Sequence, residues 1–248
     1  MVGHSFLSRH AVKHRVLRRV FSITAGLATL ASISCAQQDY VGRFDLFGGF
    51  SYLESPHINL AERGFHFQFG YRPKSWYTLG FDYSVSTGHF SLAPDLLTTS
   101  LQQQLGAQIG ALIKAGILPP TYTLTVPLDS LTQTFAAGPQ LAYHGWKPIT
   151  PFIRPSIGAI HEIATPHATD PVSAAIIAQL APSGQKTDWT AFYGFGGGFD
   201  ANISRHLAIR FQADFVHDHL FSDLLKDGRN TVRFSVGPAV QFGGNARK

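Results

Sequence analysis

The sequence contains one cysteine and one methionine, and charged residues make up only 14% of its 248 positions. The single cysteine, Cys35, lies in an N-terminal segment that we expect to be removed, which would leave no thiol for a disulfide. Beyond that segment no apolar run has the length of a transmembrane helix. Low charge with 24 glycines and 20 phenylalanines excludes a disordered chain and is unusual for a cytosolic enzyme.

Residues 1–36 have the pattern of an export signal. A basic stretch ends at Arg18-Arg19, an apolar run covers 20–33, and Ser34-Cys35-Ala36 places small residues before a cleavage site at Gln37. A twin-arginine signal and a lipoprotein cysteine are alternative interpretations. We favour ordinary secretion, because Ser32 stands where a lipoprotein signal has Leu, Val or Ile.

The net charge of +5 does not indicate nucleic-acid binding. Five of the 20 basic residues precede Asp39, which is the first acidic residue, and the rest of the chain carries 15 basic and 15 acidic side chains. The positive charge therefore belongs to the signal segment, and we expect no nucleic-acid partner.

The remaining chain, 37–248, alternates between apolar and polar residues as β-strands do. Between 77 and 86, for example, aromatic and aliphatic residues alternate with Gly, Asp, Ser and Thr. This pattern predicts eight strands, at about 41–53, 64–72, 76–87, 133–144, 149–161, 188–200, 203–216 and 230–242. Three strands contain prolines, Pro139, Pro155 and Pro238, where we expect bulges or strand ends.

Connections between the expected strands alternate between short and long. Three are tight turns, whereas two are very long, at 88–132 and 162–187. Short turns at one end and long loops at the other are typical of a transmembrane barrel with periplasmic termini and extracellular loops. The sequence therefore predicts an all-β fold, an eight-stranded antiparallel up-and-down barrel that crosses the outer membrane.

The apolar face of these strands should contact lipid, because it carries too many aromatic rings to fit inside eight strands. Tyr and Trp residues near both strand ends predict two interfacial girdles: Tyr71, Tyr77 and Tyr143 at the short-turn end, and Tyr52, Tyr83 and Trp189 at the long-loop end. The polar face should line a lumen in which opposite charges pair. Phe47 and Phe192 are exceptions that fall on that face. The expected polar network consists of Arg43, Asp45, Asp82, Arg154, Arg210, Asp214 and Arg233.

Several phrases in the sequence resemble small bacterial outer-membrane barrels of the OmpA transmembrane-domain type. They include Pro151-Phe152-Ile153-Arg154, the glycine run at 196–198, and the final strand with Gly237, Val240 and Phe242. The resemblance covers about 39–243 and implies an integral outer-membrane protein without the family's peptidoglycan-binding domain. It also implies that the last strand is the signal read by the barrel assembly machinery, although Phe242 lies six residues before the end.

Two short motifs carry side chains that could do chemistry. His89-x-Ser91 is similar to the His-x-Ser pair of outer-membrane lipid A deacylases, but the sequence places no acid beside it. His217-x-His219 could supply two metal ligands, which is too few for a site. We therefore expect no catalytic residue, no metal and no cofactor.

The two long loops are each expected to contain a helix, at 95–115 and 171–180. An apolar stripe on the first helix should pack on the second helix or on the barrel mouth; it is formed by Leu97, Leu101, Leu105, Ile109 and Leu112. We expect a structural or surface-interaction role, with lipid, lipopolysaccharide and an extracellular partner of these helices as contacts. A narrow pore, and a lipid hydrolase that uses His89 and Ser91, are the alternatives.

Overall fold

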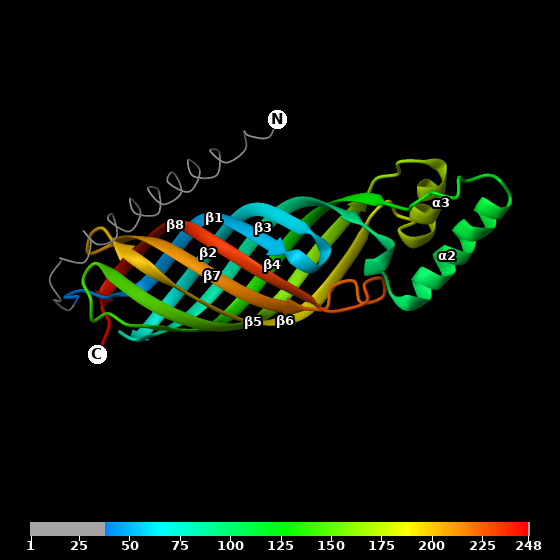
Figure 1. Ribbon diagram of the computed structural model, residues 1–248. Helices are drawn as coiled ribbons and strands as arrows, with labels where there is room; N and C mark the ends of the chain where they lie inside the picture. Colours follow the sequence, from blue (N-terminus) through cyan, green and yellow to red (C-terminus); the bar gives the residue numbers. More distant parts are fainter. Residues whose placement is uncertain (1–37, 248) are drawn as a thin grey trace, which may run out of the picture.

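The computed structural model describes residues 38–247, and the expected signal peptide lies outside these residues. Eight antiparallel strands form a closed barrel in which sequence neighbours pair and the last strand pairs with the first, as Figure 1 shows. The predicted fold class is therefore confirmed. The strands are β1 (Gly42–Ser55), β2 (Leu60–Lys74), β3 (Tyr77–Leu92), β4 (Val126–Ala142), β5 (Ile149–Pro166), β6 (Lys186–Asn202), β7 (Leu207–Asp218) and β8 (Arg229–Asn245).

The strands are longer at the long-loop end than the sequence pattern predicted. β3 continues to Leu92, β4 begins at Val126, and β5 continues to Pro166. The long loops are consequently 93–125 and 167–185 rather than 88–132 and 162–187. Strands of 12 to 18 residues exceed the roughly 9–11 that a bilayer requires, so β3 to β6 project beyond it.

The three strand prolines do not produce the expected bulges. Pro139 on β4 and Pro155 on β5 lie where the β4–β5 pairing is interrupted, and the register is the same on both sides of the gap. Pro238 lies in a similar gap between β1 and β8. Each proline thus removes ladder hydrogen bonds locally, as its missing N–H requires, without displacing the strand.

The loops contain the helices. In the first long loop a 3-10 turn, η3 (Pro94–Leu96), precedes α2 (Thr99–Lys114), and the second holds α3 (Pro171–Leu180). Another 3-10 turn, η2 (Pro56–Ile58), joins β1 to β2. The expected single helix at 95–115 is therefore interrupted at Leu97, whose backbone is extended. No helix among the described residues is long and apolar enough to span a membrane.

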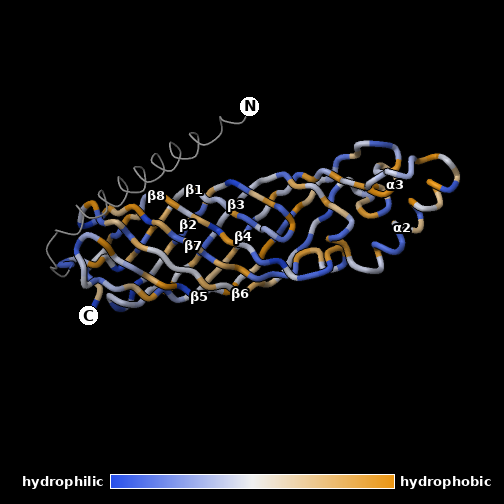
Figure 2. The backbone as a smooth tube through the Cα atoms, viewed as in Figure 1, coloured by the Kyte–Doolittle hydropathy of each residue, from blue (hydrophilic) through white to orange (hydrophobic). Residues whose placement is uncertain are grey.

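The barrel wall is apolar outside and polar inside over the part next to the short turns, which we call the lower part. Apolar and polar residues alternate along several of the strands, as the colours of Figure 2 show. Large apolar side chains such as Phe65, Phe81 and Ile157 are 71, 47 and 70% exposed on the outer surface. A surface of this kind requires an apolar medium around it.

Candidate functional site

The lumen is occupied by buried charged side chains. Six of the seven residues expected there are less than 6% exposed: Asp45, Asp82, Arg154, Arg210, Asp214 and Arg233. Arg43 is the exception and lies exposed on the barrel surface. The register between β1 and β8 shifts between Gly42 and Phe44, so the alternation that holds along the rest of β1 does not reach Arg43.

The lower cluster lies next to the short turns and contains two acids and two arginines. Arg210 binds Asp200 at 2.7 Å and Asp45 at 3.0 Å, and Arg72 binds Asp45 at 3.2 Å. The Arg210 guanidinium is also stacked between the rings of Phe47 and Phe152, 5.6 and 5.0 Å from their centroids. Phe47 can therefore face the polar lumen, because its ring makes a cation–π contact with the Arg210 guanidinium.

The middle cluster is also electrically balanced. Asp82 contacts Arg154 at 2.5 Å and Arg233 at 3.4 Å, and Arg233 donates to Asp214 at 2.8 Å. Arg154 has no other ion-pair partner in the described structure, and its contact with Asp82 is an ion pair without an aligned hydrogen bond. The charge of Arg154 is therefore compensated by one carboxylate.

The upper cluster lies where the strands approach the long loops. Arg229 binds Glu162 at 2.7 Å and Asp218 at 3.3 Å. Glu62 accepts hydrogen bonds instead of an ion pair, from the hydroxyls of Ser86, Ser130 and Thr132 at 2.5–2.9 Å. This arrangement supplies each carboxylate with at least one donor in a site without water access.

An apolar core closes the lumen above the upper cluster. Inward side chains near the upper ends of the strands, among them Val126, Leu128 and Ala164, belong to one apolar cluster with Leu105 of α2 and Ile176 of α3. The expected stripe on the first loop helix does contribute to this core, through Leu97, Leu101, Leu105 and Ile109. The apolar side chains of both helices thus contribute to one core at the barrel mouth.

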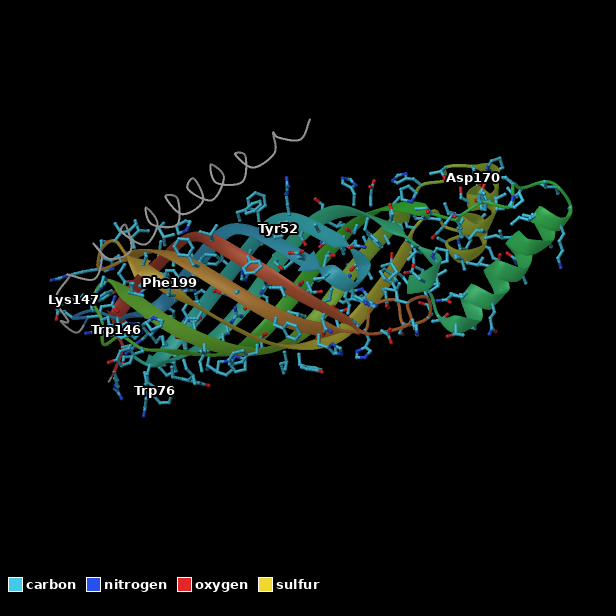
Figure 3. The ribbon with its side chains drawn as sticks, viewed as in Figure 1. Tyr52, Trp76, Trp146, Lys147, Asp170 and Phe199 are labelled. Atoms are coloured by element: carbon cyan, nitrogen blue, oxygen red, sulfur yellow. The ribbon has the colours of Figure 1, made fainter. Side chains whose placement is uncertain are left out.

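Polar contacts join the loops into one head, which we define as 93–125, 167–185 and 219–228. The Tyr122 hydroxyl donates to Asp170 at 3.1 Å and so links the two long loops. Asp170 also caps α3 by accepting from the Val172 and Ser173 amides. Thr98 N donates to Leu224 O at 2.8 Å, which attaches the first loop to the β7–β8 loop. In Figure 3, Asp170 lies at the opposite end of the molecule from Trp146 and Lys147.

Aromatic side chains mark two levels on the outer surface. Trp76 and Trp146, next to the tight turns (Figure 3), join Tyr71 and Tyr143. Trp189 and Tyr193 are 57 and 64% exposed on β6, toward the long loops. Tyr and Trp prefer the interfaces of a bilayer, so these levels bracket an apolar band.

Comparisons with known proteins agree with this geometry. Neisserial surface protein A, from its crystal structure, matches with a TM-score of 0.50 and 8% identity over 80% of this chain and 96% of that chain. The chain has the fold of a small outer-membrane β-barrel. OprG from Pseudomonas aeruginosa (TM-score 0.46, 10% identity, 84% of this chain and 100% of that one) also matches. Ail of Yersinia pestis, in complex with the heparin analogue sucrose octasulfate, matches at 0.44 and 13%, over 80 and 96%. No protein-family model matches the sequence, and no curated protein matches it significantly.

The structure places an acid beside His89. His89 Nδ1 lies 2.5 Å from Asp129 Oδ1, because the two residues are paired across β3 and β4. The other carboxylate oxygen of Asp129 binds His167 Nε2 at 2.8 Å. Ser91 shares the outward face with His89, but no hydrogen bond joins these two residues in the described structure.

The other motif residues lie on the outer surface of the barrel. His217 binds Asn230 through Nδ1, and its ring contacts His219 edge to face. No group of three or more His, Cys, Asp or Glu in residues 38–247 is arranged to hold a metal.

Val240 and Phe242 are 38 and 41% exposed on the outer side of β8. Recognition of this strand by the assembly machinery stays a prediction.

Several lumen residues were not predicted. His66 and Arg72 lie on the polar face of β2, so the alternation already contained their signal. Four others fall in segments predicted as loops, and only the longer strands of the structure bring them into the lumen; they are Glu62, Glu162, Asp218 and Arg229.

Proposed function

We propose that this protein resides in the outer membrane as a closed, non-conducting barrel that presents its extracellular head to partners. The observation that carries the proposal is the continuous filling of the lumen, by three ionic clusters and then by the apolar core. A protein that conducts ions needs a hydrated path, whereas this lumen is occupied from one end to the other.

The narrow-pore alternative has little support from the lumen. A cavity between the lower and middle clusters, lined by Asp45, Gln68, Asp82, Arg154 and Arg210 among others, has a volume of about 10 Å³. That is room for about one water molecule. Every charged group around it is also tied into an ion pair, which would have to break before a solute could pass.

Planar-bilayer recording tests whether the barrel conducts. We expect no steady conductance from the wild-type protein. A variant in which a short Gly-Ser turn replaces residues 93–125 should also stay closed, because the three ionic clusters lie below the deleted segment. Regular single-channel steps from the wild-type protein, absent in a mock preparation, would refute the closed barrel.

The head is the part of the molecule that could meet a partner. The outward face of α2 carries Gln103, Gln104, Ala107, Gln108 and Ala111, and it has no charge before Lys114. Cells that display wild-type protein should attach to a surface or to each other more strongly than cells with the 93–125 replacement. Equal attachment, with equal amounts of both barrels in the membrane, would place the function elsewhere.

A lipid hydrolase is the second candidate, and the contact between Asp129 and His89 favours it. An acid on Nδ1 is what orients a histidine to act as a base from Nε2. Release of fatty acid from phospholipid vesicles measures this activity. A hydrolase should lose it in Ser91→Ala and keep it in Ser222→Ala, whereas the closed-barrel proposal expects no release from the wild-type protein.

A further inference from the structure

Histidines are concentrated at the long-loop end of the barrel. Residues 38–247 contain nine histidines, of which His66 lies in the lumen and His144 and His206 lie near the short turns. The remaining six lie at or above the upper ends of the strands: His57, His89, His161, His167, His217 and His219. Three of them flank the outer face of β6, and we call His161, His217 and His219 the histidine patch.

The histidine patch lies at the level of the upper aromatic residues. His161 stacks on Trp189 with centroids 4.4 Å apart and an interplanar angle of 19°. His217 lies 5.4 Å from Tyr193, and His219 lies 4.9 Å from His217. Because exposed Trp and Tyr side chains take positions among lipid headgroups, these imidazoles face headgroups rather than acyl chains or bulk water.

The hydrogen bonds of the patch use Nδ1 of two of its rings and leave Nε2 of those rings directed to the surroundings. His161 Nδ1 bonds Gln133 Oε1 at 3.3 Å, and His217 Nδ1 bonds Asn230 Oδ1 at 2.7 Å. An amide oxygen only accepts, so Nδ1 is the donor in both rings. In the neutral ring Nε2 then presents a lone pair, which repels a phosphate oxygen. Only the protonated ring presents an N–H there.

Fixed charges near the patch are already engaged. Lys186 pairs with Asp223, and Asp188 accepts from the backbone N–H of Phe221. Asp129, further up β4, binds His89 and His167. The acids that flank the patch in sequence, Glu162 and Asp218, point into the lumen toward Arg229. Protonation of the histidines therefore decides whether the patch attracts anions.

We propose that the histidine patch binds the phosphate groups of outer-leaflet lipid headgroups when its imidazoles are protonated. This inference rests on the proposed membrane residence. Imidazoles as a class change charge between pH 5 and 8, so binding should strengthen on acidification. Protonated His161 would also gain a cation–π contact with the Trp189 ring on which it is stacked.

Trp189 is a built-in probe of the lipid at this position. The chain contains three tryptophans, so the variant Trp76→Phe/Trp146→Phe reports on Trp189 alone. It is reconstituted in phosphatidylcholine vesicles that contain a minor fraction of brominated phosphatidylglycerol or brominated phosphatidylcholine. The ratio of quenching by the two brominated lipids, taken at one pH, measures enrichment of the anionic lipid and cancels any direct effect of imidazole charge on Trp189.

We expect about five-fold enrichment of the anionic lipid per charged ring at about pH 5.5, and little at about pH 7.5. The triple variant His161→Gln/His217→Gln/His219→Gln should abolish this enrichment. His206→Gln, at the opposite end of the barrel, is the matched control and should retain it. Heat-modifiable gel mobility verifies that each variant is folded.

Three results would overturn the proposal. The first is the same enrichment at both pH values, and the second is enrichment that survives in the triple variant. The third is loss of enrichment on adding inorganic phosphate at constant ionic strength, which would indicate a site for free phosphate. Failure of the proposed membrane residence gives a different result, because Trp189 would then be quenched by neither brominated lipid at any pH.

Discussion

Removal of the Asp82 carboxylate should destabilise the barrel more than removal of any exposed acid. Asp82 is 1% exposed and is the sole ion-pair partner of Arg154, which is itself 2% exposed. Asp82→Asn keeps the size of the side chain but leaves the Arg154 charge buried without compensation. Loss of one partner of a buried pair costs about 3–5 kcal/mol, so we expect a loss of this size in the free energy of unfolding.

The matched control is Asp39→Asn. Asp39 pairs with Lys147 at 3.4 Å, and the two side chains are 73 and 45% exposed. An exposed pair of this kind is worth about 0–1 kcal/mol. The double variant Asp82→Asn/Arg154→Gln should recover much of the lost stability, because it removes both charges and leaves Arg233 paired with Asp214.

Urea titration of the barrel in lipid vesicles measures these differences, with gel mobility as the readout of the folded state. The expected order of midpoints is wild type, Asp39→Asn, the double variant, and then Asp82→Asn. If Asp82→Asn shifted the midpoint no more than Asp39→Asn, the lumen would be hydrated enough to screen Arg154. A lumen hydrated to that extent would not be closed.

Three further perturbations test other parts of the structure. Gly64→Val should prevent assembly, because a Cβ there would collide with a β3 carbonyl oxygen, whereas Gly48→Ala should assemble normally, because its Cβ would meet no atom; the yield of heat-modifiable protein separates them. Phe81→Arg on the lipid face should cost about 2–4 kcal/mol by urea titration, and Phe81→Leu far less. The Ser173 backbone N–H lowers the pKa of Asp170, so the α3 cap should be intact above about pH 4 and lost as pH falls further. Amide protection in the first turn of α3, taken relative to the intrinsic exchange rate at each pH, should then fall on acidification, and it should not change in this way in Asp170→Asn.

The lipid-embedded part of the barrel could be predicted because its alternation is strict. Along β3, polar residues such as Asp82 and Ser84 face the lumen, and apolar residues such as Phe81 and Val85 face lipid. A bilayer enforces this contrast on every strand, because an unpaired polar group in the acyl region is costly. The prediction for Arg43 was wrong because a register shift at the start of β1 changes the face on which this residue lies. The local sequence contains no signal of that shift.

The parts that could not be predicted lie above the bilayer or depend on cross-strand pairing. Asp129 fell in a predicted loop, so its pairing with His89 could not be inferred, since register across a long loop is set by the barrel as a whole. The upper cluster was missed for the same reason. Glu62 and Glu162 occupy strand extensions in which the usual contrast between the two faces has disappeared.

That loss of contrast has a physical cause, which β4 illustrates. Near the membrane, Thr134 points inward and Phe135 points outward, but toward the loops Leu128 points inward and Asp129 points outward. The strand is therefore inside-out in lipid and follows the ordinary soluble pattern above it, where water replaces acyl chains around the wall. The level of the change limits the height of the barrel in the membrane, because Asp129 has to stay out of the acyl region and Phe135 within it, and these two residues lie only about 20 Å apart along the strand. The same change allows the apolar core to form, since the inward side chains of the projecting strands need only the loop helices to exclude water. The head is thus a soluble domain built on the strands of a membrane protein, and its packing closes the lumen that those strands enclose.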